Sequence, residues 1–299
     1  VISPNDPMES IAGSEADAPV VFSQGSEDNV VGTIYRVEVS RPFLMHASIG
    51  PSAGLAKWDN DKVTVWTHSQ GVFQLRKAIA MALNTDEGKI TVVHQPGAGC
   101  YGHNGADDAA FDAVLMARKV PGKLVKVVWS RQNEFQASPL GPGMVTIAEA
   151  TLGSDGHIKQ MNVDVNSAPH ANRPSANGTP NLRAASYLAK PILSAPSTDL
   201  PLVRGGGADR NAVPGYDIPN IKVRKRLVHL PYRTSSLRAL GAFNNVFAIE
   251  SLIDDIASDC GEDPVSFRLR HLSDVRSRHV IEKVLESSEA ARSLPKSDG

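Results

Sequence analysis

A glycine-rich stretch, residues 95–108, combines the residue types in this chain that are most suited to binding an anion. It holds four glycines together with Cys100 and His103. The apolar run at 90–93 predicts a strand before it, and the helical spacing of 106–118 predicts a helix after it. A strand, a glycine-rich turn and a helix start present backbone N–H groups to an anion. The stretch matches neither common phosphate-loop pattern, so, taken alone, an ordinary glycine-rich turn is at least as good an interpretation.

Two other polar side chains stand at predicted helix starts. Gln70 follows a predicted strand and precedes a predicted helix at 72–83. Its amide can donate and accept hydrogen bonds and so could orient a polar ligand; alternatively it is a turn residue beside Ser69, the helix cap. Arg238 also precedes a predicted helix. Its guanidinium could hold a phosphate or an oxo group, or it could be a surface arginine.

Three further motifs leave alternatives open. Residues 50–54 fit the G-x-S-x-G pattern of serine hydrolases with Ser52 as nucleophile, but a strand-like run rather than a helix follows them. Cys100 and His103 could form half of a zinc site, although no second half is visible. The run Arg204–Gly207 could approach a ligand closely or could form a flexible turn.

The composition limits the class of protein. The chain has 31 basic and 32 acidic residues, a formal net charge of −1, and no run of like charges. It therefore lacks the electrostatic signature of a nucleic-acid-binding protein. With 299 residues, 41% of them hydrophobic, it can bury a substantial core in about two lobes. The two cysteines cannot define a disulfide framework.

Periodicity places the elements that must position these residues. We expect a tether or edge segment at 1–29, two lobes at 30–140 and 141–285, and a weakly patterned tail at 286–299. The long loop at 166–216 is expected to be functional or to cover a neighbouring segment. The predicted strands are 30–40, 55–58, 63–66, 90–93, 124–130, 145–152, 158–165 and 221–230. The predicted helices are 72–83, 106–118, one carrying Val246, Ile249, Ile253 and Ile256, and one at 264–272 that Asp263 caps.

The order of the motifs is more specific than any one of them. Ser69-Gln70 is followed by Gly97-Ala-Gly-Cys-Tyr-Gly102, then by Leu237-Arg-Ala-Leu-Gly241, Phe247–Ser251 and Asp263–Arg270. This set, spanning roughly residues 30–275, resembles the molybdopterin-binding large subunit of the xanthine oxidase/aldehyde oxidase family of molybdenum hydroxylases. The glycine-rich loop is similar to that of the nicotinate dehydrogenase and isoquinoline oxidoreductase branch. The resemblance implies a mixed α/β, two-lobed cofactor-binding fold that is incomplete here, about half of a catalytic subunit.

The resemblance also implies a molybdenum centre held by the dithiolene of a pterin, often as a cytosine dinucleotide in bacteria. No side chain would ligate the metal; the protein would hold the cofactor mainly through backbone amides. Gln70 would hydrogen-bond an oxo ligand or the pterin. The loop beneath the metal and the second contact loop would comprise Gly99, Cys100, Tyr101, Gly102, Arg238 and Ala239.

The implied reaction is hydroxylation of an N-heterocycle or an aldehyde with water as the oxygen source. Electrons would leave through [2Fe–2S] clusters on an iron–sulfur subunit, with a cytochrome as a further candidate partner. The family's catalytic glutamate lies in a segment that nothing here matches, so the general base is expected outside this chain, in the remaining part of the catalytic polypeptide. A complex in the bacterial cytoplasm and a membrane-associated or periplasmic one both fit. A non-catalytic scaffold or assembly module of the same fold is the alternative.

Overall fold

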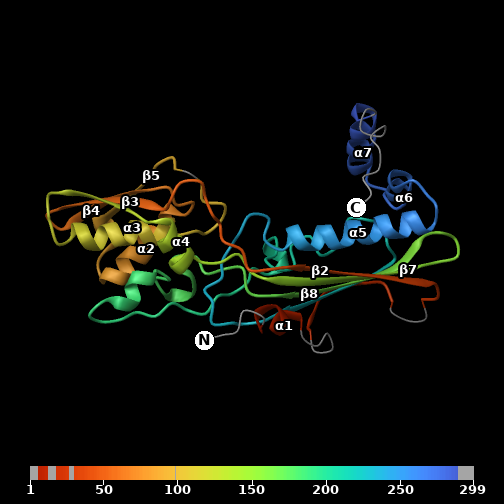
Figure 1. The fold of residues 1–299 in the computed structure, drawn as a ribbon, viewed down its shortest axis with the longest axis horizontal. Coiled ribbons are helices and arrows are strands. Elements are labelled where there is room, and N and C mark those ends of the chain that lie inside the picture. The colour runs from red at the N-terminus through yellow and green to blue at the C-terminus, as the bar shows by residue number, and fades with distance from the viewer. Residues whose placement is uncertain (1–5, 13–17, 27–29, 98, 289–299) are drawn as a thin grey trace.

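Two bodies lie side by side along the long axis of the molecule, one built on a short sheet and the other on a longer one (Figure 1). The computed structural model describes residues 6–12, 18–26, 30–97 and 99–288. The expected mixed α/β class is confirmed. The helices are α1 (Asp6–Ala12), α2 (Val72–Leu83), α3 (Ala106–Ala117), α4 (Arg131–Ala137), α5 (Ala242–Asp259), α6 (Pro264–Arg270) and α7 (Val275–Ser287). The strands are β1 (Val20–Gln24), β2 (Thr33–Arg41), β3 (Ala53–Asp59), β4 (Lys62–Thr67), β5 (Ile90–His94), β6 (Leu124–Val128), β7 (Met144–Leu152), β8 (Ile158–Ser167) and β9 (Asn220–Leu227).

The four-stranded sheet carries the glycine-rich stretch at one of its ends. Its strand order is β5-β4-β3-β6, with β3 and β4 forming the predicted hairpin. Strands β4 and β5 are parallel and are joined by α2, which buries Leu75 and Ile79 at the predicted helical spacing. The glycine-rich stretch follows β5 directly and leads into α3. The predicted strand, turn and helix order is thus confirmed.

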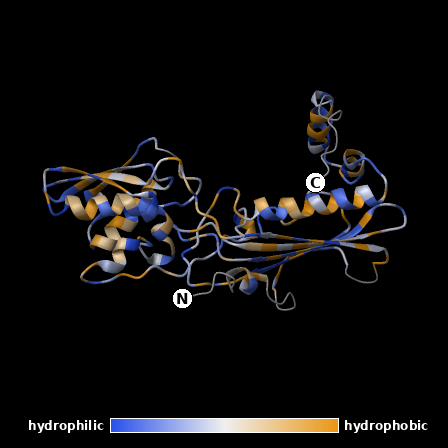
Figure 2. Ribbon diagram, in the orientation of Figure 1, coloured by the Kyte–Doolittle hydropathy of each residue, from blue (hydrophilic) through white to orange (hydrophobic). Residues whose placement is uncertain are grey.

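Small residues let α3 pack very closely on this sheet. Ala110, Ala113 and Ala117 are fully buried on the helix face that meets β3 and β6. A Cβ atom placed on Gly54 of β3 would lie 2.4 Å from the Cα of Ala110, so this glycine is required by the close approach. Hydrophobic residues gather where α2 and α3 meet the sheet (Figure 2).

The five-stranded sheet has the order β1-β9-β8-β7-β2, in which only β8 and β9 pair in parallel. Helix α5 covers one face over β2 and β7, and α1 lies on the other face against β7 and β8 (Figure 1). Both faces of β7 are therefore covered, which explains why its residues are buried along almost the whole strand. None of the described helices is both long and apolar enough to cross a membrane.

The two predicted C-terminal helices are present, with one change to the apolar face of the first. Ile249, Ile253 and Ile256 are buried on α5, whereas Val246 is 40% exposed. Asp263 caps α6 by accepting a hydrogen bond from the backbone N–H of Ser266, and a proline occupies the first helical position as predicted.

Several elements differ from the expectation. The segment expected as a tether or edge, 1–29, contains α1 and the edge strand β1, which pairs with β9. Strand β2 pairs with β7 and joins the five-stranded sheet, although it lies within 30–140. Alternation identifies a strand but not its neighbour in the sheet.

Periodicity did not predict two further helices, α4 and α7. Helix α4 is set by local capping, because Ser130 and Asn133 form a capping box. Helix α7 begins after the cap residue Asp274 and has no buried residue, so it shows no apolar face facing a core. It ends at Ser287, inside the range expected as the tail, and the rest of that range, 289–299, lies outside the described residues.

Candidate functional site

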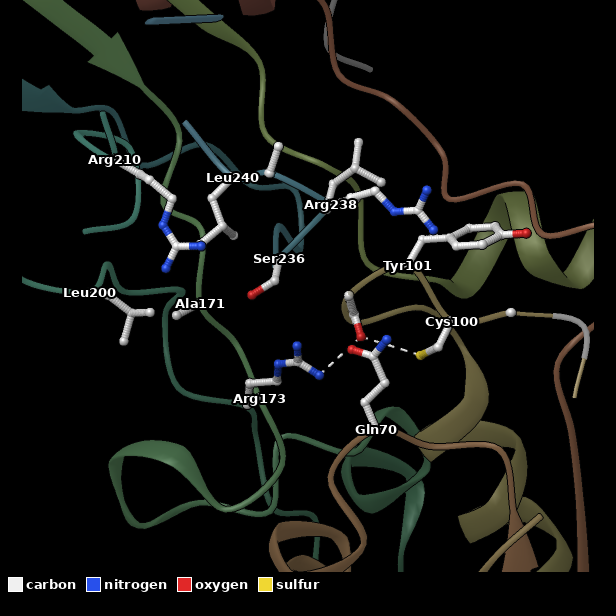
Figure 3. A pocket seen from close by; sticks show the side chains of 14 residues that line it. Gln70, Cys100, Tyr101, Ala171, Arg173, Leu200, Arg210, Ser236, Arg238 and Leu240 are labelled. Carbon is white, nitrogen blue, oxygen red and sulfur yellow. Dashed lines mark hydrogen bonds between the residues drawn. The ribbon is translucent and has the colours of Figure 1, made fainter. Parts of the chain in front are cut away.

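A cavity of about 590 Å³ lies where loops of the two bodies meet (Figure 3). Every residue to which the resemblance assigned a cofactor contact lines it. These are Gln70, Gly99, Cys100, Tyr101, Gly102, Arg238 and Ala239. Three segments that are far apart along the chain are therefore brought to one site. The remaining lining residues are Ala171, Arg173, Leu200, Arg210, Ser236, Leu237 and Leu240.

The glycine-rich loop and the Arg238 loop are joined by backbone hydrogen bonds. Gly102 and Leu237 form an antiparallel bridge between them. A Cβ atom on Gly102 would lie 2.1 Å from the carbonyl oxygen of Ser236, so no other residue fits between the two loops without a shift of the backbone. Hydrogen bonds of 2.8 Å flank the bridge, from the N–H of His103 to Ser236 and from the N–H of Arg238 to Tyr101.

Three non-glycine residues that line this cavity have a strained backbone. Tyr101, Ala239 and Leu240 have φ values of 52°, 71° and 54°, in the left-handed region that L-residues rarely adopt. Each such residue costs on the order of 1–3 kcal/mol, and surrounding structure must hold it in place. Gly99 and Gly102 adopt φ values of 102° and 122° without that cost. Strain of this kind is typical of ligand sites.

Positive charge dominates the cavity wall. Among the described residues, the lining includes three arginines and neither aspartate nor glutamate. Arg173 donates to the carbonyl oxygen of Gly102 at 3.0 Å, and Arg210 donates to that of Gly205 at 2.8 Å. The Arg238 guanidinium lies 5.0 Å from the centre of the Tyr101 ring. These partners orient the guanidinium groups without neutralising them, which suits an anionic ligand.

Gln70 is exposed toward the cavity, in the turn that connects β4 to α2. The predicted role of Ser69 as the cap of α2 is wrong, since Gly71 is the N-cap residue and no side chain caps the helix. The Ser69 hydroxyl instead accepts a hydrogen bond from the Gly71 N–H at 3.0 Å and donates one to Asp107 at 2.5 Å. Both bonds fix the turn that presents Gln70.

Cys100 and His103 do not form half of a zinc site. The Cys100 sulfur lies 3.2 Å from the carbonyl oxygen of Gly102 and from Oδ1 of Asn104, and burial raises the pKa of the thiol. The His103 ring is fully buried and pairs with the Ser235 hydroxyl at 2.8 Å. In the part of the chain that the structure describes, no group of three or more His, Cys, Asp or Glu residues could hold a metal ion.

The serine hydrolase alternative is also wrong. Ser52 is fully buried and lies directly before β3, so a strand follows it instead of the helix that a nucleophile elbow requires. Its backbone N–H donates to the Glu134 carboxylate at 2.5 Å. No substrate can reach this hydroxyl group.

The run Arg204–Gly207 approaches other parts of the chain rather than forming a flexible turn. A Cβ atom on Gly207 would lie 1.8 Å from the Asp199 carboxylate, and the carbonyl of Gly207 accepts a 3.0 Å bond from the N–H of Gly241. This packing carries Arg210, three residues further on, into the cavity wall. Arg210 and Arg173 come from the long loop at 166–216, where no periodicity or motif distinguishes them.

A second cavity of about 310 Å³ adjoins the first and shares Gln70 and Arg173 with it. Asp107, in the first turn of α3, also lines this second cavity although it is only 2% exposed. Burial is the main cause that raises the pKa of this carboxyl from 3.8 to about 6. The hydrogen bond from Ser69 opposes that shift, and the neighbouring Asp108 adds to it.

The raised pKa of Asp107 predicts a specific pH dependence of stability. Because its pKa is higher in the folded chain, about 6, than the ordinary 3.8, the native state binds this proton more tightly. The protonated Asp107 carboxyl contributes fully to the free energy of unfolding below pH 3.8, its ordinary pKa. That contribution is lost as the pH rises through about 6, a change of about 3 kcal/mol. Asp107→Asn cannot titrate, so its free energy of unfolding relative to wild type should rise by that amount from about pH 4 to about pH 7. Urea unfolding of both proteins at several pH values checks this, and a difference independent of pH would contradict it.

Known proteins match this chain over most of its length. The molybdopterin cofactor-binding domain matches residues 24–187 and 206–272. A nicotinate dehydrogenase subunit of Pseudomonas putida is 33% identical over 273 residues, which cover 90% of this chain and 22% of that protein. The beta subunit of isoquinoline 1-oxidoreductase from Brevundimonas diminuta is 25% identical over 94% of this chain and 35% of its own length.

The fold is shared with solved structures. Aldehyde oxidoreductase from Desulfovibrio gigas superposes with a TM-score of 0.66 at 19% identity, over 92% of this chain and 30% of that one. Quinoline 2-oxidoreductase from Pseudomonas putida 86 gives a TM-score of 0.67 at 17% identity, over 87% and 33%. This chain therefore spans roughly a fifth to a third of the length of the proteins it matches.

Proposed function

This chain belongs to the molybdopterin cofactor-binding domain family, and from that premise we propose that it forms the cofactor-binding part of the catalytic subunit of a molybdenum hydroxylase. The proposed substrate is an N-heterocycle or an aldehyde, and water is the source of the inserted oxygen. The names of the relatives support this class, since they include a nicotinate dehydrogenase and an isoquinoline oxidoreductase. The single observation that carries the proposal is the cavity shared by Gln70, the glycine-rich loop and Arg238.

The cavity fits a molybdenum-bearing pterin on its own chemistry. Three guanidinium groups and no carboxylate line it among the described residues, which suits the phosphate of the cofactor. Gly99 and Gly102, both at positive φ, give this loop a conformation in which its backbone lines the cavity. Bound there, the cofactor would supply two-electron redox chemistry on an oxygen derived from water.

The residues of this chain would bind the cofactor and orient it in the cavity. Gln70 offers an amide that both donates and accepts, at the turn facing the cavity. Residues 99–102 and Ala239 would contact the cofactor through the backbone. Arg173, Arg210 and Arg238 would balance its negative charge. No carboxylate of the described residues lines the main cavity, and we place the general base in the remaining part of the catalytic polypeptide.

The finer features of the complex are also proposals. We propose the cytosine dinucleotide form of the cofactor, which the resemblance of the glycine-rich loop implies. The nicotinate dehydrogenase and isoquinoline 1-oxidoreductase relatives are both named as single subunits, which supports assembly with other chains. We propose that these are the rest of the catalytic polypeptide and an iron–sulfur partner with [2Fe–2S] clusters, with a cytochrome as a further electron acceptor.

Analysis of the native complex separates this function from the scaffold alternative. We expect about one molybdenum and one pterin for each copy of the chain, and reduction of an electron-accepting dye when an N-heterocycle or an aldehyde is added. A scaffold or assembly module would give neither. An intact, active preparation that contains neither molybdenum nor pterin would reject the proposal.

Replacing Gln70 by alanine should affect turnover far more than stability. Loss of one oriented hydrogen-bonding group at a reacting centre typically lowers the rate by about a hundredfold or more. The side chain is exposed, so the free energy of unfolding should change by less than about 0.5 kcal/mol. Gln74→Ala is the matched control, because Gln74 is an exposed glutamine one turn further on that lines only the second cavity. Equal losses of activity and thermal stability in Gln70→Ala would contradict the assignment.

A further inference from the structure

A buried series of polar groups runs behind the wall of the main cavity. The Asp107 carboxylate accepts a hydrogen bond from the Ser69 hydroxyl at 2.5 Å, and its other oxygen lies 3.3 Å from Nε2 of His103. Nδ1 of His103 meets the Ser235 hydroxyl at 2.8 Å, and that hydroxyl accepts the backbone N–H of Asn172 at 3.0 Å. All five residues are at most 2% exposed.

The members of this series sit next to residues of the cavity wall in the sequence. Four separate segments, from both bodies of the molecule, are involved. Ser69 precedes Gln70, His103 follows Gly102, Asn172 precedes Arg173, and Ser235 precedes Ser236. Asp107 is the one charged member. Ser69 and His103 contact it from within the body of the four-stranded sheet, and His103 in turn meets Ser235, which binds Asn172 in the loops of the other body.

The donors in the series require an acceptor at Asp107. Burial holds the pKa of His103 well below its ordinary value, so the ring is neutral and carries one proton. Nε2 makes no hydrogen bond to any described residue, and the Asp107 carboxylate lies 3.3 Å from it. A proton on Nε2 therefore faces Asp107 and leaves Nδ1 to accept from Ser235. The Ser69 hydroxyl, which already accepts the Gly71 N–H, donates to the other carboxylate oxygen. In Asp107→Asn the side chain has one acceptor oxygen and one NH2 group, so the NH2 group would face one of these two donors and could not accept from it.

Stability does not explain a carboxylate in this place. Its burial raises the pKa, which means that the ionised form is disfavoured by the fold itself. A neutral side chain of the same shape would remove that penalty. What an ionised carboxylate adds is a pair of acceptor oxygens, one facing Ser69 and the other facing His103, the residue that meets Ser235 of the other body.

We propose that Asp107 is a positioning residue that holds Gln70, the glycine-rich loop and the Arg173 segment in place around the main cavity. It acts through Ser69 on one side and through His103 and Ser235 on the other. The identity of the ligand in that cavity rests on the proposed function, whereas the positioning role rests on the contacts of the carboxylate with Ser69 and His103 alone.

Amide hydrogen exchange of the full native protein tests the positioning role without reference to any ligand. In Asp107→Asn the backbone amides of Gly71, His103 and Asn172 should exchange about tenfold faster, the loss expected when one hydrogen bond is broken locally. Asp112→Asn is the matched control: the same substitution on the same helix, at a part-buried carboxylate that binds the Trp129 indole at 2.9 Å. It should leave these amides unchanged.

Unchanged exchange at these amides in Asp107→Asn, or faster exchange confined to α3, would overturn the proposal. Should Asp107→Asn fail to fold, Ser69→Ala removes a hydroxyl and no charge. In that variant the Gly71 amide loses its own acceptor, so the readout is the His103 amide on the other side of Asp107, which should exchange faster than in wild type. Protection at His103 equal to wild type in that variant would likewise overturn the proposal.

The state and the amount of bound molybdenum provide a second test. In Asp107→Asn the electron paramagnetic resonance spectrum of the reduced molybdenum centre should change and the molybdenum content should fall, while Asp112→Asn should match wild type in both. Faster exchange in Asp107→Asn with unaltered spectrum and content would limit the residue to a structural role and contradict the proposal. A wild-type protein without molybdenum would reject the proposed function, and hydrogen exchange would still decide the positioning role.

Discussion

Replacing Gly102 by alanine should separate the two loops that form the cavity and should be among the most damaging single changes in the chain. The added Cβ atom would lie 2.1 Å from the Ser236 carbonyl oxygen and 2.8 Å from its carbon, which are backbone atoms that cannot turn away. The φ value of 122° is also unfavourable for alanine. We expect a loss of about 3 kcal/mol or more in the free energy of unfolding, together with loss of bound cofactor.

Gly122→Ala provides the matched control for this prediction. Gly122 also has a positive φ value, 79°, but no atom lies within 4 Å of an added Cβ. It should therefore show the backbone penalty alone, about 1 kcal/mol, and should retain the cofactor. Chemical unfolding and molybdenum content of both variants make the comparison. Equal effects of the two substitutions would show that the contact between the loops is not what Gly102 provides.

Replacing Arg233 by methionine should destabilise the protein by about 3–5 kcal/mol, because it leaves the buried Asp108 carboxylate without its counter-charge. Nη1 of Arg233 lies 2.6 Å from Asp108, whose side chain is 1% exposed. The other guanidinium nitrogens donate to the carbonyl of Asn181 at 2.8 Å and to the Asn172 side chain at 3.1 Å. The guanidinium thus joins α3 to the loops of the other body.

Two further variants make the Arg233 prediction specific. Lys283→Met removes one partner of an ion pair in which both side chains are 65% exposed, so it should change the free energy of unfolding by less than about 1 kcal/mol. Adding Asp108→Asn to Arg233→Met removes the uncompensated charge and should recover part of the loss. Chemical unfolding measures all three. A double variant no more stable than Arg233→Met alone would contradict the explanation.

Local elements of the fold were predictable because their signals are local. The helical spacing of Val72, Leu75, Ile79 and Leu83 predicts the bounds of α2. Asp263 with Pro264 marks the start of α6. Sheet partners were not predictable, since β2 alternates in the same way whether it pairs with β3 or with β7. Helix α7 was missed although Val280 and Val284 lie one helical turn apart; both side chains are exposed, and the helix has no buried residue.

The residues of the candidate site likewise include some that the sequence identified and some that only the structure shows. Residues in motifs, such as Gln70, Cys100 and Arg238, were identified from their order along the chain. Arg173 and Arg210 were missed because they come from a long loop without periodicity, and only the folded chain shows that they face the same cavity. Ser52 shows the reverse case, a motif whose surroundings rule out the chemistry that it suggests.

Anomalous X-ray scattering at the molybdenum absorption edge, from crystals of the native complex, would show whether this cavity holds the metal. We expect one strong peak for each copy of the chain, at the cavity bounded by Gln70, Cys100 and Arg238. A molybdenum peak at another place on the chain, or none in crystals of an active preparation, would contradict the proposed function.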